Sequence, residues 1–394
     1  MIINDKRELA YVVLIDDIEP IEGADRVETA IVGGWRVMVR KDQFKVGDKA
    51  IYFEIDSKVP QTPEFEFLSK KNWKIKTQKY FKGKVISQGL LMSFEDLNLD
   101  SSLEVHQPLT EQLGVKYAVD EDNIRKGTDF DSAMQSLKDR RKTLFKKPII
   151  KKLMKYAWGR KLVFFLFGSK RDVSRGFPKG FPYISKTDEE RVENMPWVLE
   201  NKTPMILTEK LDGTSCTYIL EKKRFGKYEF YVSSRNVRQL PNTVTYHQQT
   251  NQMDKNIYWE LAEKYDIENK LKAYLKENKL KYVCIQGEGV GYVQGNPLKL
   301  NEDRLYVFNF IRSDKGRLSS TEGKEIIEKM GMNWVPILAT DYVLPDSMEE
   351  FKLFADGNSV VNPKVMREGL VIREPVSGLS FKNVSRQFLL EHNG

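Results

Sequence analysis

A lysine between two strand-like runs is the feature that most constrains this chain. Residues 204–209 and 214–220 alternate in polarity and are rich in β-branched residues, as is a third run at 228–234, so antiparallel strands are predicted. Lys210 stands at a strand end, where its amine can attack phosphorus while Asp212 holds metal-bound water. Gly213 lets the backbone approach a ligand closely. The same string arises by chance in about one chain in ten of this length, and then marks a solvated turn.

Charged residues recur at the ends of later strand-like runs. Glu288 lies between two glycines after an apolar run, Glu368 precedes another, and Lys382 lies in the last one. The glycines around Glu288 could indicate a dinucleotide-binding loop, but a polar loop follows where a helix would have to begin, so a Rossmann site is rejected. Strands with flanking helices predict an α+β domain with a cleft. Helices are expected near 257–280, 320–330 and 347–356.

Composition limits the class of protein and the kind of partner. The chain has 394 residues, a formal charge of +8 and a sequence pI of about 9.0, which favours a polyanionic partner. Two cysteines cannot build a disulfide framework and suit a reducing cytoplasm, where we expect the protein to reside. Three scattered histidines argue against a His/Cys metal site. No apolar run reaches the roughly 20 residues that span a bilayer, so no membrane association is expected.

The first hundred residues predict a small domain of their own. Five short strand-like runs fall between residues 9 and 92, and Gly33-Gly34 marks a tight hairpin turn. Together they predict an OB-type β-barrel over residues 1–105. Cations alternate with aromatic residues at 70–84, which is typical of nucleic-acid binding, although a solvated lysine-rich loop with buried rings fits equally well. The candidate nucleic-acid-binding residues, for RNA if the resemblance described below holds, are Lys74, Lys76, Lys82 and Lys84.

A basic segment connects this domain to the rest of the chain. Residues 106–180 are expected to form a helical connector, most basic at 138–170, which could lie on RNA or a membrane or cover a domain seam. Glycines and prolines at 176–182 mark the start of a second domain at 181–394. Thr187 is expected to cap a short helix, and Arg191 faces either a triphosphate or solvent.

These parts suit one kind of chemistry. An attacking lysine needs an unprotonated amine, so its pKa has to fall from about 10.4 through desolvation or a nearby cation. The carboxylates Asp212, Glu288 and Glu368 can hold a hydrated divalent metal beside it. Fixed cations can hold the phosphates and an aromatic ring can cover the base. The sequence therefore predicts nucleotidyl transfer through a phosphoramide intermediate.

The ordered motifs resemble the covalent nucleotidyltransferases, a superfamily of polynucleotide ligases and mRNA capping enzymes. Residues 210–215 look like motif I, and five further segments follow in the family's order. They are 234–236 (motif Ia), 286–289 (III), 306–308 (IIIa), 368–371 (IV) and 380–382 (V). The chain ends soon after motif V, with no room for the C-terminal OB domain of DNA ligases and capping enzymes. With its N-terminal module and the segment 186–191, it most resembles the ATP-dependent RNA ligases that carry an N-terminal OB domain.

This resemblance implies an activity and roles for individual residues. It implies that Lys210 takes AMP from ATP, that Mg²⁺ or Mn²⁺ is needed, and that a monomer seals 3′-OH/5′-phosphate breaks in nicked RNA duplexes. Lys210 is implied as the nucleophile, while Asp212, Glu288 and Glu368 hold the metal through bound water. The residues implied to bind the nucleotide are Arg191, Glu209, Arg235, Glu288, Phe308, Glu368 and Lys382, with Phe308 stacked on adenine.

One position departs from the family's pattern. Motif V often carries two lysines two residues apart, but Ser380 stands at the first position, so Arg386 or Lys364 is expected to substitute. The alternatives are a DNA ligase, a capping guanylyltransferase, or a non-catalytic RNA-binding protein with a relic nucleotide pocket. The missing C-terminal module disfavours the first two, and the intact set of Lys210, Glu288, Glu368 and Lys382 disfavours the third.

Overall fold

The computed structural model describes most of the chain. The described residues are 1–3, 6–118, 145, 147–154, 159, 163, 166–167, 184, 187–235, 238–239, 244–247 and 252–392. Its contacts divide the chain into one unit of residues 1–117 with 180–394 and another of 118–179. Most of the predicted basic connector, including much of 138–170, lies outside the described residues, apart from pieces such as α3 (Pro148–Leu153).

Short antiparallel strands build the first domain, as its sequence predicts. Strand β7 (Lys49–Phe53) lies between β3 (Ala10–Leu14) and β12 (Leu90–Met92), while β5 (Val27–Val32) lies between β4 (Asp17–Pro20) and β6 (Trp35–Arg40). Both Gly33 and Gly34 have positive φ, which lets β5 turn directly into β6. The other elements are β1 (Ile2–Ile3), β2 (Lys6–Arg7), β8 (Ser57–Lys58), η1 (Pro63–Lys71), β9 (Lys74–Ile75), β10 (Gln78–Tyr80), η2 (Phe81–Gly83), β11 (Val85–Ser87), η3 (Glu95–Leu97) and β13 (Lys116–Tyr117).

Residues just beyond the predicted boundary at 105 pack on this first domain. Pro108 forms a bridge with Tyr11, and β13 pairs with β8. Leu109 and Val115 are buried in the same apolar cluster as the strand residues. The packing of the first domain therefore extends to about residue 117.

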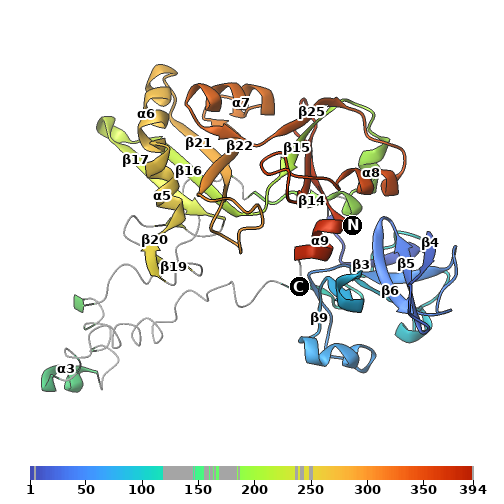
Figure 1. Ribbon diagram of the computed structural model, residues 1–394. Coiled ribbons are helices and arrows are strands. Elements are labelled where there is room, and N and C mark those ends of the chain that lie inside the picture. Colours follow the sequence, from blue (N-terminus) through green and yellow to red (C-terminus); the bar gives the residue numbers. More distant parts are fainter. Residues whose placement is uncertain are drawn as a thin grey trace. The chain divides into compact units, whose positions relative to one another are not determined.

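Two sheets form the second domain (Figure 1). The five-stranded sheet has the order β14 (Glu190–Arg191), β27 (Ser380–Val384), β26 (Gly369–Arg373), β15 (Met205–Lys210) and β25 (Ile337–Tyr342). The seven-stranded sheet has the order β18 (Arg238–Gln239), β17 (Tyr228–Ser234), β16 (Thr214–Lys222), β21 (Tyr282–Val290), β22 (Arg304–Arg312) and β23 (Gly316–Arg317), with β24 (Asn333–Trp334) beside β22.

The segment after Lys210 crosses from one sheet to the other. Strand β15 pairs with β25 and β26, whereas β16 pairs with β17 and β21, so Lys210 does not lie in a hairpin. The two sheets approach closely here, because a Cβ on Gly213 would lie 2.3 Å from the carbonyl oxygen of Gly289. A glycine is therefore required at the crossing.

Helices cover the sheets, and two of the helix predictions differ from the structure. Figure 1 shows α5 (Ile257–Lys264) and α6 (Ile267–Glu277) beside the seven-stranded sheet, where one continuous helix was expected; Asp266 interrupts them with φ of 49°. No helix begins at Thr187, because residues 187–189 are irregular and lead into β14. The remaining described elements are η5 (Val192–Asn194), η6 (Pro196–Glu200), η7 (Arg224–Gly226), β19 (Val244–His247), β20 (Gln252–Lys255), α7 (Ser320–Lys329), α8 (Met348–Phe354) and α9 (Arg386–His392).

The first domain contacts the five-stranded sheet of the second. Ile86 packs with Val384 and Leu389, and the guanidinium of Arg386 donates to the carbonyl oxygen of Gly34 at 3.1 Å. These contacts involve buried groups, so the first domain supports the last strand and helix of the described chain. None of the described helices is long and apolar enough to cross a membrane.

Candidate active site

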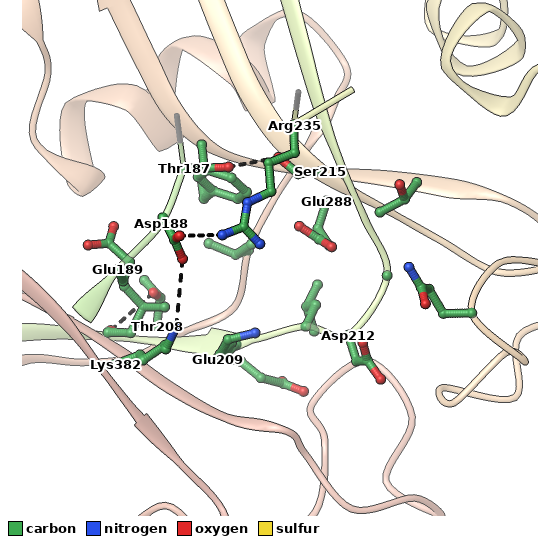
Figure 2. A pocket seen from close by; sticks show the side chains of 18 of the residues that line it. Thr187, Asp188, Glu189, Thr208, Glu209, Asp212, Ser215, Arg235, Glu288 and Lys382 are labelled. Carbon is green, nitrogen blue, oxygen red and sulfur yellow. Dashed lines mark hydrogen bonds and ion pairs between the residues drawn. The ribbon is translucent and has the colours of Figure 1, made fainter. Parts of the chain in front are cut away.

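A pocket of about 360 Å³ opens where the two sheets meet (Figure 2). Most of the residues predicted to act as nucleophile, to bind the nucleotide or to hold the metal line it together. They are Glu209, Lys210, Asp212, Arg235, Glu288, Phe308 and Lys382. Arg191 and Glu368, the other two, do not line the pocket but contact its residues, as described below. The structure therefore brings these seven side chains from five separate sequence segments to one place.

Strand register explains why these side chains converge. Lys210 pairs with Gly369, the residue after Glu368, because β15 and β26 are antiparallel. Lys382 pairs with Val371 on the other side of β26. Glu288 pairs with Ser215 in the second sheet. Each sheet thus brings its polar strand ends to the crossing that follows Lys210.

The amine of Lys210 is held by Glu368. Its Nζ donates to Oε1 of Glu368 at 2.6 Å, and a quarter of the lysine side chain is exposed. Burial lowers the pKa of Lys210, but the charge and hydrogen bond of Glu368, with Glu288 and Asp212 behind it, outweigh burial and raise the pKa above its ordinary value. This differs from the lowered pKa that the sequence argument requires for attack, because three carboxylates gather around one amine.

The carboxylates around Lys210 repel one another, and the pKa values of two of them are raised. Burial raises the pKa of Glu288 to about 8. The charge of Lys210 acts in the opposite direction, while Glu368 and Asp212 raise the pKa further. Burial and Glu368 raise the pKa of Asp212 to about 6. The second oxygen of Glu368 is buried and has no hydrogen-bond partner among the residues that the structure describes.

This arrangement fits a hydrated cation. A divalent cation beside the three carboxylates would relieve their repulsion and meet the unpaired oxygen of Glu368. Across the described part of the chain, no group of three His, Cys, Asp or Glu side chains is close enough to hold a metal directly. The residues therefore suit a cation bound through its water molecules rather than one with protein ligands.

Cations line the opposite part of the pocket and share one acidic partner. Burial, together with Arg191 and Lys210, lowers the pKa of Lys382 to about 8. Its Nζ lies 3.8 Å from a carboxylate oxygen of Asp188, which also forms an ion pair with Arg235 (Figure 2). Thr187 is hydrogen-bonded to Ser215 at 2.7 Å, which holds the segment carrying Asp188 over the pocket. Sequence reasoning assigned no role to Asp188, since an acidic residue next to Thr187 also suits the first turn of a helix.

Arg191 lies behind the pocket rather than on its surface. It pairs in β14 with Lys382 of β27, and its guanidinium lies over the ring of Trp35 in the first domain, 5.9 Å from the centroid. One of its terminal nitrogens is buried without a hydrogen-bond partner. Arg191 therefore lies at the junction of the two domains. The sequence left open whether it faces a triphosphate or solvent, and it does not line the pocket.

Glu209 and Phe308 are fixed by the backbone around them. The carboxylate of Glu209 accepts a hydrogen bond from the amide of Val360 at 2.8 Å, and burial raises the pKa of this side chain. The carbonyl oxygen of Phe308 accepts a bond from the guanidinium of Arg373 at 2.7 Å. Both residues line the pocket. The side chain of Glu209 is held by a loop, and the backbone of Phe308 is held by Arg373 of β26.

Arg373 is the cation next to the departure in motif V. It pairs with Ser380 across β26 and β27, and its Nε donates to the Ser380 hydroxyl at 3.3 Å. Arg373 lines the pocket, whereas Lys364 and Arg386 do not, and Arg386 instead pairs with Glu349 at 2.7 Å. The expected substitutes are therefore not in the pocket. The available signal in the sequence was a cation at the end of a strand-like run, without its register opposite Ser380.

The four candidate RNA-binding lysines lie elsewhere in the first domain. Lys76, Lys82 and Lys84 are exposed and Lys74 is partly exposed, all within or beside β9, β10 and η2. Trp73 packs against the apolar cluster of this domain, while Phe81 is 39% exposed. One ring is thus partly buried and another lies at the surface, and nucleic-acid binding by this segment stays a prediction.

Comparison with known proteins places both domains. A family model described as RNA ligase matches residues 203–386, and a model described as an OB-fold domain matches residues 9–94. The predicted N-terminal OB-type domain and the α+β architecture are thereby confirmed. Among curated proteins, the search found no match.

Solved structures similar to the chain include an RNA ligase of the amoeboflagellate Naegleria gruberi in several forms. Its structure with pyrophosphate is 27% identical, with a TM-score of 0.64 over 98% of this chain and 99% of that one. A mutant with AMP and manganese is 26% identical, with a TM-score of 0.65 over 98% and 99%. A mutant with ATP and manganese is 26% identical, with a TM-score of 0.64 over 98% and 100%.

Proposed function

We propose that this chain, a member of the ATP-dependent RNA ligases with an N-terminal OB-fold domain, seals 3′-OH/5′-phosphate breaks in nicked RNA duplexes through a lysyl-AMP intermediate on Lys210. One observation carries the proposal. The Nζ of Lys210 lies 2.6 Å from Glu368 in a pocket that also presents Glu288, Phe308 and Lys382. A nucleophile, carboxylates, a ring and a phosphate-binding cation are thus within one cavity.

The reaction would proceed in three transfers. The unprotonated amine of Lys210 attacks the α-phosphorus of ATP, a phosphorus–nitrogen bond forms, and the bond to the β-phosphate oxygen breaks to release pyrophosphate. An oxygen of the RNA 5′-phosphate then attacks the same phosphorus and releases the lysine. Finally the RNA 3′-OH attacks the activated 5′-phosphate and AMP leaves.

The carboxylates prepare the nucleophile. Asp212, Glu288 and Glu368 would hold a divalent cation, Mg²⁺ or Mn²⁺, through its water molecules, and its charge would offset the negative field that now raises the pKa of Lys210. Glu368 holds the amine in place and is the nearest acceptor for its proton. The Naegleria structures with ATP or AMP and manganese support this assignment.

The remaining residues hold the nucleotide. Phe308 stacks on adenine, while Lys382, Arg235 and Arg191 stabilise the phosphates, with Glu209 next to the nucleophile. Lys382 and Arg235 form ion pairs with Asp188. A bound triphosphate competes with Asp188 for these two cations and replaces it. The OB-fold domain, with Lys74, Lys76, Lys82 and Lys84, engages the RNA. We further propose that the protein acts as a monomer in the cytoplasm.

Label transfer from α-labelled ATP tests the proposal. The parent should acquire a covalent AMP label, and Lys210→Ala should acquire none while retaining some sealing of pre-adenylylated RNA. Lys202→Ala, at an exposed lysine of the same domain, is the matched control and should label normally. Labelling from GTP instead would indicate a capping enzyme, and equal sealing of an all-DNA nick would indicate a DNA ligase. An unlabelled parent would overturn the proposal.

A further inference from the structure

The turn between β16 and β17 exposes an aromatic ring in an unfavourable backbone conformation. Phe225 is 97% exposed and its φ is +60°. A left-handed conformation is disfavoured for a bulky residue other than glycine, and an exposed ring gains nothing from burial. The left-handed backbone and the exposed ring both disfavour phenylalanine at this position. This indicates that the ring contacts a binding partner rather than stabilising the fold.

Cations flank this turn on two neighbouring segments. The turn supplies Lys222, Arg224 and Lys227, and α6 with the residue that precedes β21 supplies Lys272, Lys276 and Lys281. We call these six cations and Phe225 the turn patch. They are contiguous, because the amide of Lys222 donates to the carbonyl of Lys281 at 2.8 Å. The ammonium groups of Lys272 and Lys276 lie 5.1 and 5.8 Å from the ring centroid of Tyr228, which directly follows the turn.

The charge of this region is not balanced locally. None of the six cations forms an ion pair with any acidic side chain in the part of the chain that the structure describes, whereas the neighbouring Lys223 pairs with Glu221. Residues 221–229 and 272–281 contain eight Lys or Arg and three Glu, an excess of five, against a formal +8 for the whole chain. The turn patch is therefore a concentrated positive surface that favours a polyanion.

We propose that the turn patch binds the phosphate backbone of a duplex RNA arm at a distance from the break. This inference rests on the proposed function and adds a second RNA contact, in the catalytic domain. Strand β16 begins at the pocket with Thr214 and ends at the turn with Lys222, so the patch lies about 27 Å from the pocket at the usual rise per residue. A duplex reaches it only with an arm of at least about eight base pairs, because the 3.4 Å rise of B-form DNA is an upper value for an A-form duplex.

RNA fits this surface better than a protein does. A specific protein interface buries at least about 1,200 Å², largely around an apolar centre, and one phenylalanine flanked by cations offers no such centre. A-form RNA presents phosphates on both sides of a wide, shallow minor groove lined with riboses. The cations of the turn patch match those phosphates, and the ring of Phe225 can lie against the riboses between them.

Charge reversal combined with arm length tests the proposal. The substrates are pre-adenylylated RNA nicks whose two arms are either about five or about twenty base pairs, each closed by a hairpin loop so that short arms stay folded. Arg224→Glu with Lys227→Glu should reduce sealing about tenfold or more with long arms and leave short arms at the parental rate. Removing two phosphate contacts should also flatten the log–log salt dependence of long-arm binding by about 1.4 to 1.8. Phe225→Ser should weaken long-arm binding without changing the salt slope.

A second charge reversal and a separate assay make the outcomes distinct. Lys41→Glu with Lys45→Glu changes net charge equally at exposed positions of the first domain and should preserve the parental ratio of long-arm to short-arm sealing. If Arg224→Glu with Lys227→Glu seals both lengths like the parent, or loses both alike, the inference is overturned. Label transfer from ATP reports the proposed function independently, because the turn patch lies outside the nucleotide pocket.

Discussion

The guanidinium of Arg191 lies over the ring of Trp35, 5.9 Å from its centroid, and joins the OB-fold domain to the nucleotide pocket. Trp35 is 1% exposed and stacks on Tyr52 in the core of the first domain. On its other side, Arg191 pairs through β14 with Lys382, whose pKa it helps to lower. A ring of the OB-fold domain thus contacts a cation that the family resemblance implies in phosphate binding.

The first prediction is that Trp35 affects the use of ATP. Trp35→Leu removes the π face beneath Arg191, and a cation–π contact of about 0.5–2 kcal/mol predicts a two- to thirtyfold rise in the ATP concentration that half-saturates adenylylation. Trp35→Phe retains a ring and should stay close to the parent. Trp197→Leu, at a ring that is 46% exposed in the catalytic domain, controls for the loss of a tryptophan. Equal ATP requirements in the leucine and phenylalanine variants would show that the ring does not position Arg191.

The second prediction concerns the proton on Lys210. Since Glu368 and its neighbours hold the pKa of this amine above its ordinary value, reactivity towards an amine-reactive ester without metal or ATP should rise only at strongly alkaline pH. Glu368→Gln removes the largest charge that raises the pKa, so the midpoint should move to lower pH. Peptide mass spectrometry after labelling measures Lys210 alone. Glu200→Gln, at an exposed carboxylate, should leave the midpoint in place, and an unmoved midpoint in Glu368→Gln would contradict the ion pair.

The third prediction links metal binding to pH. Glu288, with its pKa raised to about 8, and Asp212, with its pKa raised to about 6, hold protons around neutral pH that a cation has to displace. Apparent affinity for Mn²⁺ should therefore fall as pH drops from about 8 to about 6, by up to about tenfold per pH unit for one displaced proton. Electron paramagnetic resonance of free Mn²⁺ measures this affinity at each pH and does not depend on ligase activity. Glu288→Gln should flatten the dependence near pH 8, and an unchanged slope would remove Glu288 from the metal site.

Strand periodicity accounts for how much of the site the sequence could predict. Lys210 lies at the end of β15 and Glu288 lies near the end of β21. Charged residues at the ends of strand-like runs predict a cleft there, and both residues line the pocket. Gly33-Gly34 likewise predicts the turn between β5 and β6, since paired left-handed residues match the twist of a hairpin. These inferences need only local information.

Long-range packing accounts for what the sequence could not predict. The alternation of polar and apolar residues in 204–209 and 214–220 indicates two strands but not which strands they pair with. From the sequence, the segment at Lys210 therefore resembles a hairpin, whereas the two strands belong to different sheets. Thr187 precedes acidic residues, as a helix cap does, yet its hydroxyl bonds to Ser215. The contact of Arg191 with Trp35 depends on how two domains pack. The role of Arg373 depends on register across two strands.

The pair of Lys352 and Glu193 anchors the segment that carries Arg191. Both side chains are almost fully buried, their charged atoms lie 2.8 Å apart, and Lys352 also donates to the carbonyl of Val384 at 2.9 Å. Burial raises the pKa of Glu193, but the charges of Lys352 and Arg191 outweigh burial and lower the pKa, which favours the ionised carboxylate. Glu193 lies two residues after Arg191, so α8 fixes the end of the segment on which Arg191 is placed.

The fourth prediction is that this pair stabilises the fold in a pH-dependent way. Lys352→Met leaves the charge of Glu193 buried without a partner, which should cost about 3–5 kcal/mol in the free energy of unfolding. The unpaired carboxylate then has a folded-state pKa above its unfolded value of about 4.3, so the loss should grow as pH rises from about 5 to 8. Urea unfolding at several pH values measures it. Glu193→Leu added to Lys352→Met should recover most of the stability, because no buried charge remains. Lys324→Met, which breaks the more exposed pair with Glu328, should cost at most about 0.5 kcal/mol, and an equally small loss in Lys352→Met would show that Glu193 is not charged in the folded protein.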